Sequence, residues 1–151
     1  MHLDEFDRRL LNALQQDNQQ TGEQLADQVG LSAAACLRRA QKLRENGAIE
    51  REVAILSPEV VGRRLTVIVL VTLERHETLG NESFRKRMLA DEAVTQCYSV
   101  TGSADYVVIL SVVDMEAYED FTQLYFYDRS IKRFESLASL TKVKFTTAVP
   151  L

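Results

Sequence analysis

The stretch EQLADQVGLS, residues 23–32, decides the fold of the first half of the chain. Its apolar residues recur at helical spacing until Gly30, so two helices separated by a turn are expected. A helix-turn-helix needs a small residue where the backbones approach, a turn residue that accepts a positive φ, and an apolar residue after the turn. Ala26, Gly30 and Leu31 supply these features in that order. The stretch therefore predicts a helix-turn-helix.

Helical patterns continue on both sides of this stretch. A first helix is expected over residues 4–16, because acidic residues crowd its first turn and an apolar stripe follows. The stripe consists of Leu3, Phe6, Leu10 and Leu14. The second helix begins at Thr21, which forms a capping-box pattern with Gln24. The third runs from its N-cap Ser32 to about Glu45.

The third helix has two chemically different faces. Cys36, Ala40 and Leu43 share one face at helical spacing and are expected in the core. Small and basic residues share the other face, and the candidates for DNA contact there are Ser32, Ala35, Arg38, Arg39 and Lys42. Small residues let a helix enter the major groove, while arginine and lysine reach phosphates or guanine edges. Double-stranded DNA is the expected partner; the alternative is an ordinary solvated basic face.

Composition limits the class of protein. The chain has 151 residues and a formal net charge of −4, which excludes a wholly basic nucleic-acid binder and leaves DNA contact to a local patch. The two cysteines lie far apart and are expected to be reduced thiols. The longest apolar stretch, residues 65–73, is too short to span a bilayer, and residues 1–5 do not resemble a signal peptide. The expected location is the cytoplasm, with no membrane partner.

The sequence carries no recognisable catalytic or metal-binding motif. It has no G-x-S-x-G, no P-loop and no G-x-G-x-x-G. His2 and His76 have no partner at metal-ligand spacing, and Glu74 and Glu77 beside His76 are the expected solvated end of a strand. We expect no metal, no cofactor and no enzymatic activity.

The second half alternates strands and helices in the order β-α-β-β-α-β. Strands are expected over residues 64–74, 94–101 and 106–113 and within 134–147, and helices over 81–90 and 114–126. The inward residues of the second of these helices are expected to be Met115, Tyr118, Thr122 and Tyr125. Residues 48–56 are extended in character and are expected to form a strand and linker. This order predicts an α+β protein with a winged helix-turn-helix domain (1–50), a linker strand (51–63) and a ferredoxin-like, ACT-like domain (64–151).

Two expected strands are apolar on both faces. Thr66–Val71 and Tyr106–Leu110 do not alternate apolar and polar residues, as a sheet with one solvated face should. Two helices cover only one face, so we expect the other to pack against the same sheet of a second subunit, giving a homodimer. The alternative is that the N-terminal domain covers this face.

Several motifs resemble those of the Lrp/AsnC (leucine-responsive, feast/famine) regulators. They are Leu31-Ser32, Cys36-Leu37-Arg38-Arg39, Leu43 and Gly47-Ala48-Ile49, together with the opening LDEFDRRLL of residues 3–11. The β-α-β-β-α-β half resembles the effector domain of that family. The resemblance covers almost the whole chain. It implies a transcription regulator whose DNA binding is modulated by a small effector, an amino acid, and whose dimers assemble further, as octamers in the family.

Residues 101–106 form a tight loop between two expected strands. Gly102 frees a backbone N–H and Asp105 supplies a carboxylate, groups that suit an amino acid; from spacing alone, a hairpin turn in which the aspartate caps its own backbone is favoured. The family's G-x-x-D-[YF] signature is similar to Gly102, Asp105 and Tyr106, and the resemblance implies a pocket between dimers. The candidate effector residues are Ser99, Thr101, Gly102, Ser103, Ala104 and Asp105, with Ser136 from a neighbouring subunit. Residues 131–136 depart from the family's pattern, since no Pro-Gly precedes them and Phe134 is bulky.

Two other functions remain open at this stage. One is a nucleoid-type DNA-binding protein that has no effector. The other is an enzyme, because sirohaem decarboxylases resemble the same two-domain fold; they need histidines and arginines around a tetrapyrrole, and this chain has two histidines.

Overall fold

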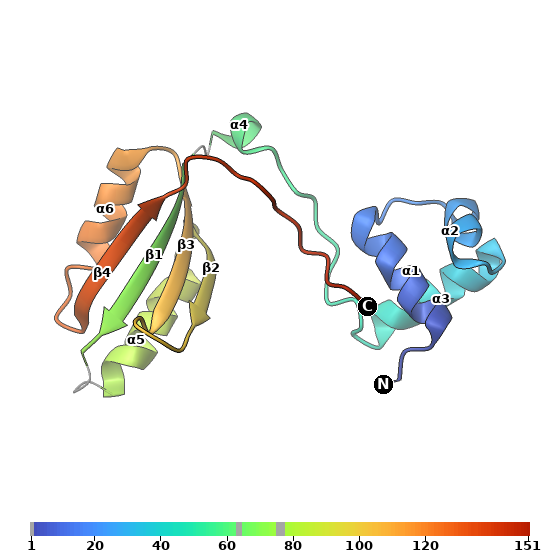
Figure 1. Cartoon of the computed structure of the whole chain (residues 1–151), viewed down its shortest axis with the longest axis horizontal. Coiled ribbons are helices and arrows are strands. Elements are labelled where there is room, and N and C mark those ends of the chain that lie inside the picture. Colours follow the sequence, from blue (N-terminus) through green and yellow to red (C-terminus); the bar gives the residue numbers. More distant parts are fainter. Residues whose placement is uncertain (1, 63–64, 75–77) are drawn as a thin grey trace. The chain divides into compact units, whose positions relative to one another are not determined.

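The computed structural model describes residues 2–62, 65–74 and 78–151. The chain divides into two compact units, which are considered one at a time (Figure 1). The first comprises Met1–Ile55 together with Val143–Leu151, and the second comprises Leu56–Lys142. Residues 143–151, which the sequence assigned to the second domain, therefore group with the first.

Three helices form the first unit: α1 (Glu5–Gln16), α2 (Gly22–Val29) and α3 (Ala33–Glu45). Each begins at a side-chain cap, because the side chains of Asp4, Thr21 and Ser32 accept the backbone N–H three residues on. Gly30 ends α2 with a φ of 81°, in the left-handed region that favours glycine. The predicted turn between α2 and α3 is thus confirmed.

The three helices enclose one apolar core. Its buried members are Leu10, Leu11, Ala13, Leu25, Val29, Cys36, Ala40 and Leu43. The prediction for α3 is confirmed, whereas Phe6 of the predicted stripe on α1 is 36% exposed.

Gly22 is a small residue that the sequence pattern alone did not single out. A Cβ atom there would lie 3.2 Å from the Cβ of Ala33, so Gly22 marks a close approach of α2 to α3.

The prediction of a strand over residues 48–56 is wrong. Residues 51–57 have no regular secondary structure, so the helix-turn-helix carries no wing strand in the described part of the chain. An extended segment becomes a strand only when a neighbour satisfies its backbone groups. A short helix, α4 (Pro58–Val61), follows this segment.

The second unit is an antiparallel sheet with helices on one face (Figure 1). Its elements are β1 (Leu65–Leu73), α5 (Thr78–Ala90), β2 (Val94–Ser99), β3 (Tyr106–Val112), α6 (Met115–Tyr125) and β4 (Ile131–Ala138). The strand order is β2-β3-β1-β4, which confirms the ferredoxin-like prediction. Arg64 and residues 75–77, which include His76 and Glu77, lie outside the described residues.

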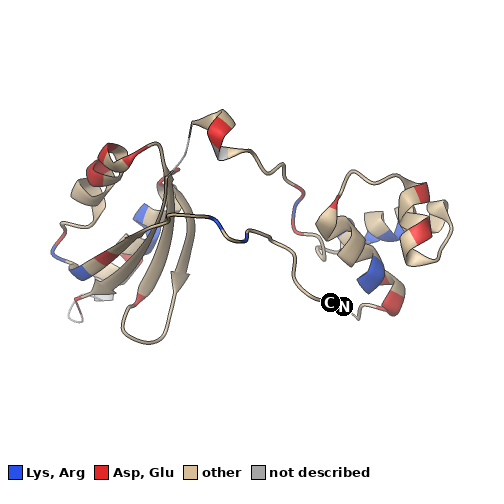
Figure 2. Cartoon of the chain, turned by 45° about the horizontal axis from the view of Figure 1, so that its top comes forward, with Lys and Arg blue, Asp and Glu red and all other residues tan. Residues whose placement is uncertain are grey.

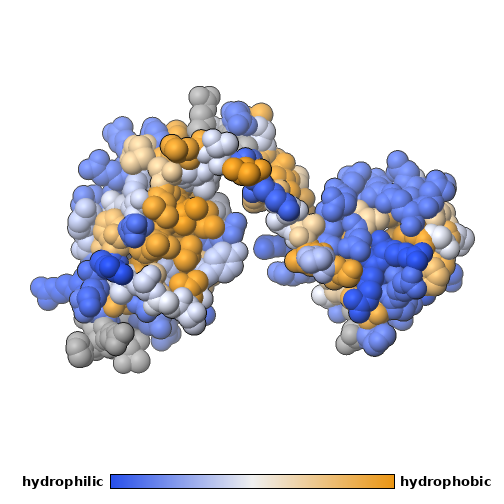
Figure 3. Space-filling model, viewed as in Figure 1, coloured by the Kyte–Doolittle hydropathy of each residue, from blue (hydrophilic) through white to orange (hydrophobic). Residues whose placement is uncertain are grey.

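The two faces of the sheet differ in burial. Alternate residues of β1 and β3, such as Val69 and Val108, are fully buried beneath the helices. The other face carries apolar residues that are only partly covered, and Figure 3 shows a hydrophobic area on this part of the molecule. We call this the open sheet face; its apolar residues are Ile68, Leu70, Tyr98, Val107, Ile109 and Leu137.

Two details of the second unit differ from the sequence expectation. Met115 is 57% exposed because it starts α6, whereas Phe121 is buried together with Tyr118 and Thr122. The last strand is Ile131–Ala138, earlier than the predicted 134–147, and residues 140–151 have no regular structure. Near the end of this tail, the Val149 backbone exchanges two hydrogen bonds with the Gln15 side chain on α1, at 2.7 and 3.0 Å.

Candidate DNA-binding face and effector loop

The outward face of α3 presents two cations to solvent. Arg38 and Lys42 lie one helical turn apart, and both are exposed. Neither is in an ion pair with any described residue; Arg38 Nε donates only to the Ala34 carbonyl, at 3.4 Å. Ser32 is exposed and caps the helix, while Ala35 is half-buried. Figure 2 shows that acidic and basic residues are mixed in this unit, so the basic character is local to this face.

Arg39, one residue away, has a different environment. Its Nη1 lies 2.8 Å from Asp4 Oδ2 and 2.7 Å from Asp7 Oδ1, both at the start of α1. The N-cap hydrogen bond from the Asp7 N–H and the Arg39 guanidinium lower the pKa of the Asp4 carboxyl. The same two carboxylates raise the pKa of Arg39. The sequence pattern of α3 groups Arg39 with the DNA contacts and does not predict these partners.

Arg44 connects the end of α3 to the segment that follows it. Its guanidinium donates to both oxygens of Glu52, at 3.1 and 2.8 Å. This bidentate pair raises the pKa of Arg44 and lowers the pKa of Glu52. It ties the irregular segment after α3 to the end of the helix.

The loop between β2 and β3 is held at its base by Asp105. The Asp105 N–H donates to the Val71 carbonyl at 2.9 Å, and the Asp105 Oδ2 accepts the Leu73 N–H at 2.8 Å. One carboxylate oxygen is thus used to join the loop to β1. Gly102 has a φ of 119°, a backbone conformation that other residues rarely adopt. Thr101, Gly102 and Ser103 are exposed, and Ala104 is half-buried.

Two residues that the sequence analysis missed join this loop. Arg133 on β4 donates from Nη2 to the Ser103 carbonyl at 3.2 Å and from Nε to the Thr72 hydroxyl at 3.4 Å. Thr72 and Arg133 are paired across β1 and β4, so the strand register brings them together. The acceptors of Arg133 are neutral, and no ion pair with a described residue neutralises its charge.

Three residues connected with the predicted effector site have other surroundings: the candidates Ser136 and Ser99, and the signature residue Tyr106. Ser136 lies on the helix-covered face of β4, where its hydroxyl bonds Tyr118 on α6, so it does not meet the loop within one chain. Tyr106 is buried, with its ring 4.9 Å from that of Phe84 and its hydroxyl donating to Asn81, so it has a packing role. Ser99 is exposed and pairs with Tyr106 across β2 and β3.

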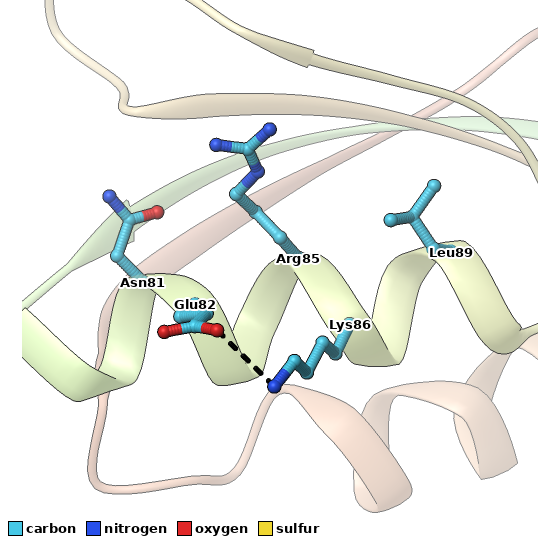
Figure 4. Close-up of a pocket in the computed structure, with 5 residues that line it drawn as sticks. All are labelled: Asn81, Glu82, Arg85, Lys86 and Leu89. Carbon is cyan, nitrogen blue, oxygen red and sulfur yellow. Dashed lines mark ion pairs between the residues drawn. The ribbon is translucent and has the colours of Figure 1, made fainter.

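The surface also carries a hollow of about 290 Å³ along α5 (Figure 4). Its lining consists of Asn81, Glu82, Arg85, Lys86 and Leu89. Glu82 and Lys86 form an ion pair at 3.2 Å, one helical turn apart. One helix supplies the whole lining, so the hollow does not include the loop. Among the described residues, no group of three or more potential ligands could hold a metal ion, and no helix is long and apolar enough to cross a membrane.

Comparison with known proteins agrees with both halves of the architecture. Residues 3–44 match the AsnC-type helix-turn-helix domain, and residues 66–149 match the Lrp/AsnC ligand-binding domain. The chain belongs to the Lrp/AsnC family. Its members include transcriptional regulators that bind DNA, as the sequence motifs indicated.

Individual transcriptional regulators are similar to this chain over most of its length. A helix-turn-helix transcriptional regulator from Sinorhizobium fredii is 45% identical over 152 residues, covering 100% of this chain and 90% of the relative. An AsnC-family regulator from Agrobacterium tumefaciens is 33% identical with a TM-score of 0.89, over 97% of this chain and 96% of its own. A regulator from Neisseria meningitidis, solved as an L-Met complex, is 29% identical with a TM-score of 0.91, over 99% and 97%.

Proposed function

We propose that this chain is a sequence-specific regulator whose dimers place α3 of each subunit in the major groove of DNA. The observation that supports this most is the outward face of α3. It presents Arg38 and Lys42, with Ser32 as the N-cap of the same helix, in a confirmed helix-turn-helix. Cations without ion-pair partners in this position gain phosphate contacts and release counterions. Ala35 completes the proposed face as a small residue that allows close approach.

Dimer formation through the open sheet face is the second part of the proposal. Ile68 on β1 is paired with Ile109 on β3 and with Leu137 on β4, so the apolar residues form a continuous row across three strands. Large exposed apolar patches are uncommon on proteins that function as monomers. A second copy has the same patch, and a two-fold interface is self-complementary. Two subunits then offer two recognition helices to a site with two half-sites. Octamers would be built from such dimers.

We propose an amino acid as the effector, bound at the loop of residues 101–105. The regulator from Neisseria meningitidis was solved with L-Met, and it matches this chain over almost its whole length. In this chain, Arg133 offers a cation for the effector carboxylate, and Asp105 has a second oxygen for the ammonium. Gly102, Ser103 and Ala104 supply backbone groups, with Ser99 and Thr101 beside them. Ser136 would contribute only from another subunit, after releasing Tyr118.

Replacing Arg133 with glutamine tests this site. We expect stabilisation of the protein by its effector in a thermal-shift screen of the twenty amino acids, and we expect R133Q to weaken that binding by about tenfold or more, the cost of one charged partner. Arg133 is exposed, so the melting temperature without ligand should change little. The matched control is K132Q, which removes the neighbouring exposed cation and should respond like the wild type. An equal response from R133Q would exclude Arg133 from the site.

The whole proposal is tested by selecting bound sequences from a random pool of duplex DNA, with and without the stabilising amino acid. Enrichment of a two-fold symmetric sequence that shifts with the amino acid is the expected result. Enrichment without any response to amino acids would favour a nucleoid-type protein without an effector. The absence of any enriched sequence, with a coloured complex after addition of haem, would favour the enzyme. A regulator of this kind acts on DNA in the cytoplasm.

A further inference from the structure

Arg39 connects α3 to α1 through a closed set of hydrogen bonds. Asp4 and Asp7 form the capping box of α1: the Asp7 N–H donates to Asp4 Oδ1 at 2.8 Å, and the Asp4 N–H donates to Asp7 Oδ2 at 3.2 Å. Each carboxylate therefore keeps one oxygen for the other helix. Arg39 Nη1 donates to both of these remaining oxygens. All four carboxylate oxygens thus have a partner, and one guanidinium nitrogen holds two carboxylates.

The surroundings of Arg39 also fix its side chain. Its guanidinium carbon lies 5.8 Å from the centre of the Phe6 ring, within the range of a cation–π contact. The Arg39 side chain is 35% exposed and that of Asp7 only 17%. Phe6, which is 36% exposed, lies against Arg39 and is not part of the buried core. A partly buried pair is screened less by salt than a surface pair.

Charge distinguishes Arg39 from Arg38 and Lys42 on the same helix. Two carboxylates neutralise Arg39, whereas Arg38 and Lys42 have no ion-pair partner among the described residues. Arg39 Nη1 donates to both aspartates, so a DNA phosphate that approached Nη2 or Nε would lie next to two carboxylates. The repulsion between the phosphate and these carboxylates opposes such a contact.

From this geometry we infer that Arg39 does not contact DNA but holds α3 at the position on α1 from which Arg38 and Lys42 reach the phosphates. Arg39 is then a positioning residue, and Asp4 and Asp7 position α3 together with it. This differs from the sequence expectation, which grouped Arg39 with the DNA contacts. The inference rests on the proposed DNA binding and specifies how the recognition helix is held.

The salt dependence of DNA binding separates the two roles. A lost phosphate contact lowers the slope of log affinity against log salt by about 0.9 for each contact. If Arg39 is a positioning residue, R39Q should weaken binding to the selected operator by about tenfold and leave the slope unchanged, a coupling of ordinary size between contacting groups. K42Q, one turn from Arg38 on the same helix, is the matched control and should lower the slope by about one per subunit.

The aspartates supply a second, independent readout. D7N leaves Arg39 in place but weakens its attachment, so it should weaken operator binding by about the same factor as R39Q, and the double variant should be no weaker than either single one. R39K, which keeps a cation in reach of the carboxylates, should restore part of the affinity. Circular dichroism at the assay temperature checks that each variant is folded. If R39Q unfolds, D7N and R39K still test the inference.

Two results would overturn the inference. In the first, R39Q lowers the salt slope as K42Q does while D7N tightens binding, which would make Arg39 a phosphate contact with which the aspartates compete. In the second, R39Q and D7N lower only the melting temperature and leave operator affinity unchanged, which would make the cluster purely structural. A wild-type protein that binds no duplex would instead contradict the proposed function itself.

Discussion

Replacing Ile109 with glutamate is expected to convert the protein into a monomer. Ile109 lies on the open sheet face, on β3, where it is paired with Ile68 on β1 and Gln96 on β2. It is half-buried in a single chain, so a glutamate there can reach water and the subunit should still fold. In a dimer formed through this face, each subunit would bury a carboxylate among apolar residues without a partner. Breaking an interface in this way costs several kcal/mol, on the order of 3–5 kcal/mol for an uncompensated buried charge.

Loss of the dimer should also weaken DNA binding. Two linked recognition helices gain from an effective concentration in the millimolar range, so separating them should lower operator affinity by about 100-fold. Sedimentation velocity and fluorescence anisotropy on the same samples measure both effects. Leu124→Glu is the matched control, since Leu124 is 67% exposed on α6 and lies away from the open sheet face. A dimeric I109E protein would show that the subunits meet elsewhere.

Removal of Arg38 and Lys42, the exposed cations on the outward face of α3, is expected to abolish specific DNA binding at physiological salt. The double variant Arg38→Gln/Lys42→Gln removes two candidate phosphate or guanine contacts per subunit, or four per dimer. Each phosphate contact contributes about 0.9 to the salt slope, so the slope should fall by about 3 to 4. Both side chains are exposed and make no ion pair with described residues, so the melting temperature should change little.

The control for this variant removes the same charge from the other unit. Arg85 and Lys86 are neighbouring exposed cations on α5, so Arg85→Gln/Lys86→Gln has an identical net charge. This control should keep at least most of the affinity and slope if the contacts are local to α3. An equal loss in the two double variants would mean that overall charge, and not the face of α3, governs DNA binding.

Local sequence chemistry predicted the helix-turn-helix well. Gly30 and the capping residues Thr21 and Ser32 act within three or four residues of the chain, and the structure confirms each of them. The ion pairs of Arg39 could not be predicted in this way, because they join residues 32 and 35 positions apart in the sequence. Whether a cation on a helix faces solvent or another helix depends on the tertiary packing of α1 against α3.

In the second unit too, local sequence predicts the elements but not the contacts between them. The β-α-β-β-α-β order was evident because apolar periodicity is local, but the placement of Arg133 beside Ser103 depends on the register between β1 and β4. Ser136 was expected in the effector site because of a resemblance, and only the structure shows the hydrogen bond between its hydroxyl and that of Tyr118. Residues 48–56 have a strand-like sequence. A strand forms, however, only beside a neighbour with free backbone groups, and local sequence patterns do not reveal whether such a neighbour is present.

Site-directed cleavage tests most directly whether α3 of each subunit enters DNA at its own half-site. An iron chelate would be attached to A34C, an exposed position in the first turn of α3, in a C97S background in which Cys36 stays buried. We predict two symmetric clusters of cleavage on the selected operator, with centres about 10 base pairs or a multiple of that apart. The same chelate on E119C, on α6 of the other unit, provides the control. Uniform cleavage by A34C, or the same pattern from both positions, would contradict the placement of α3 in the two half-sites.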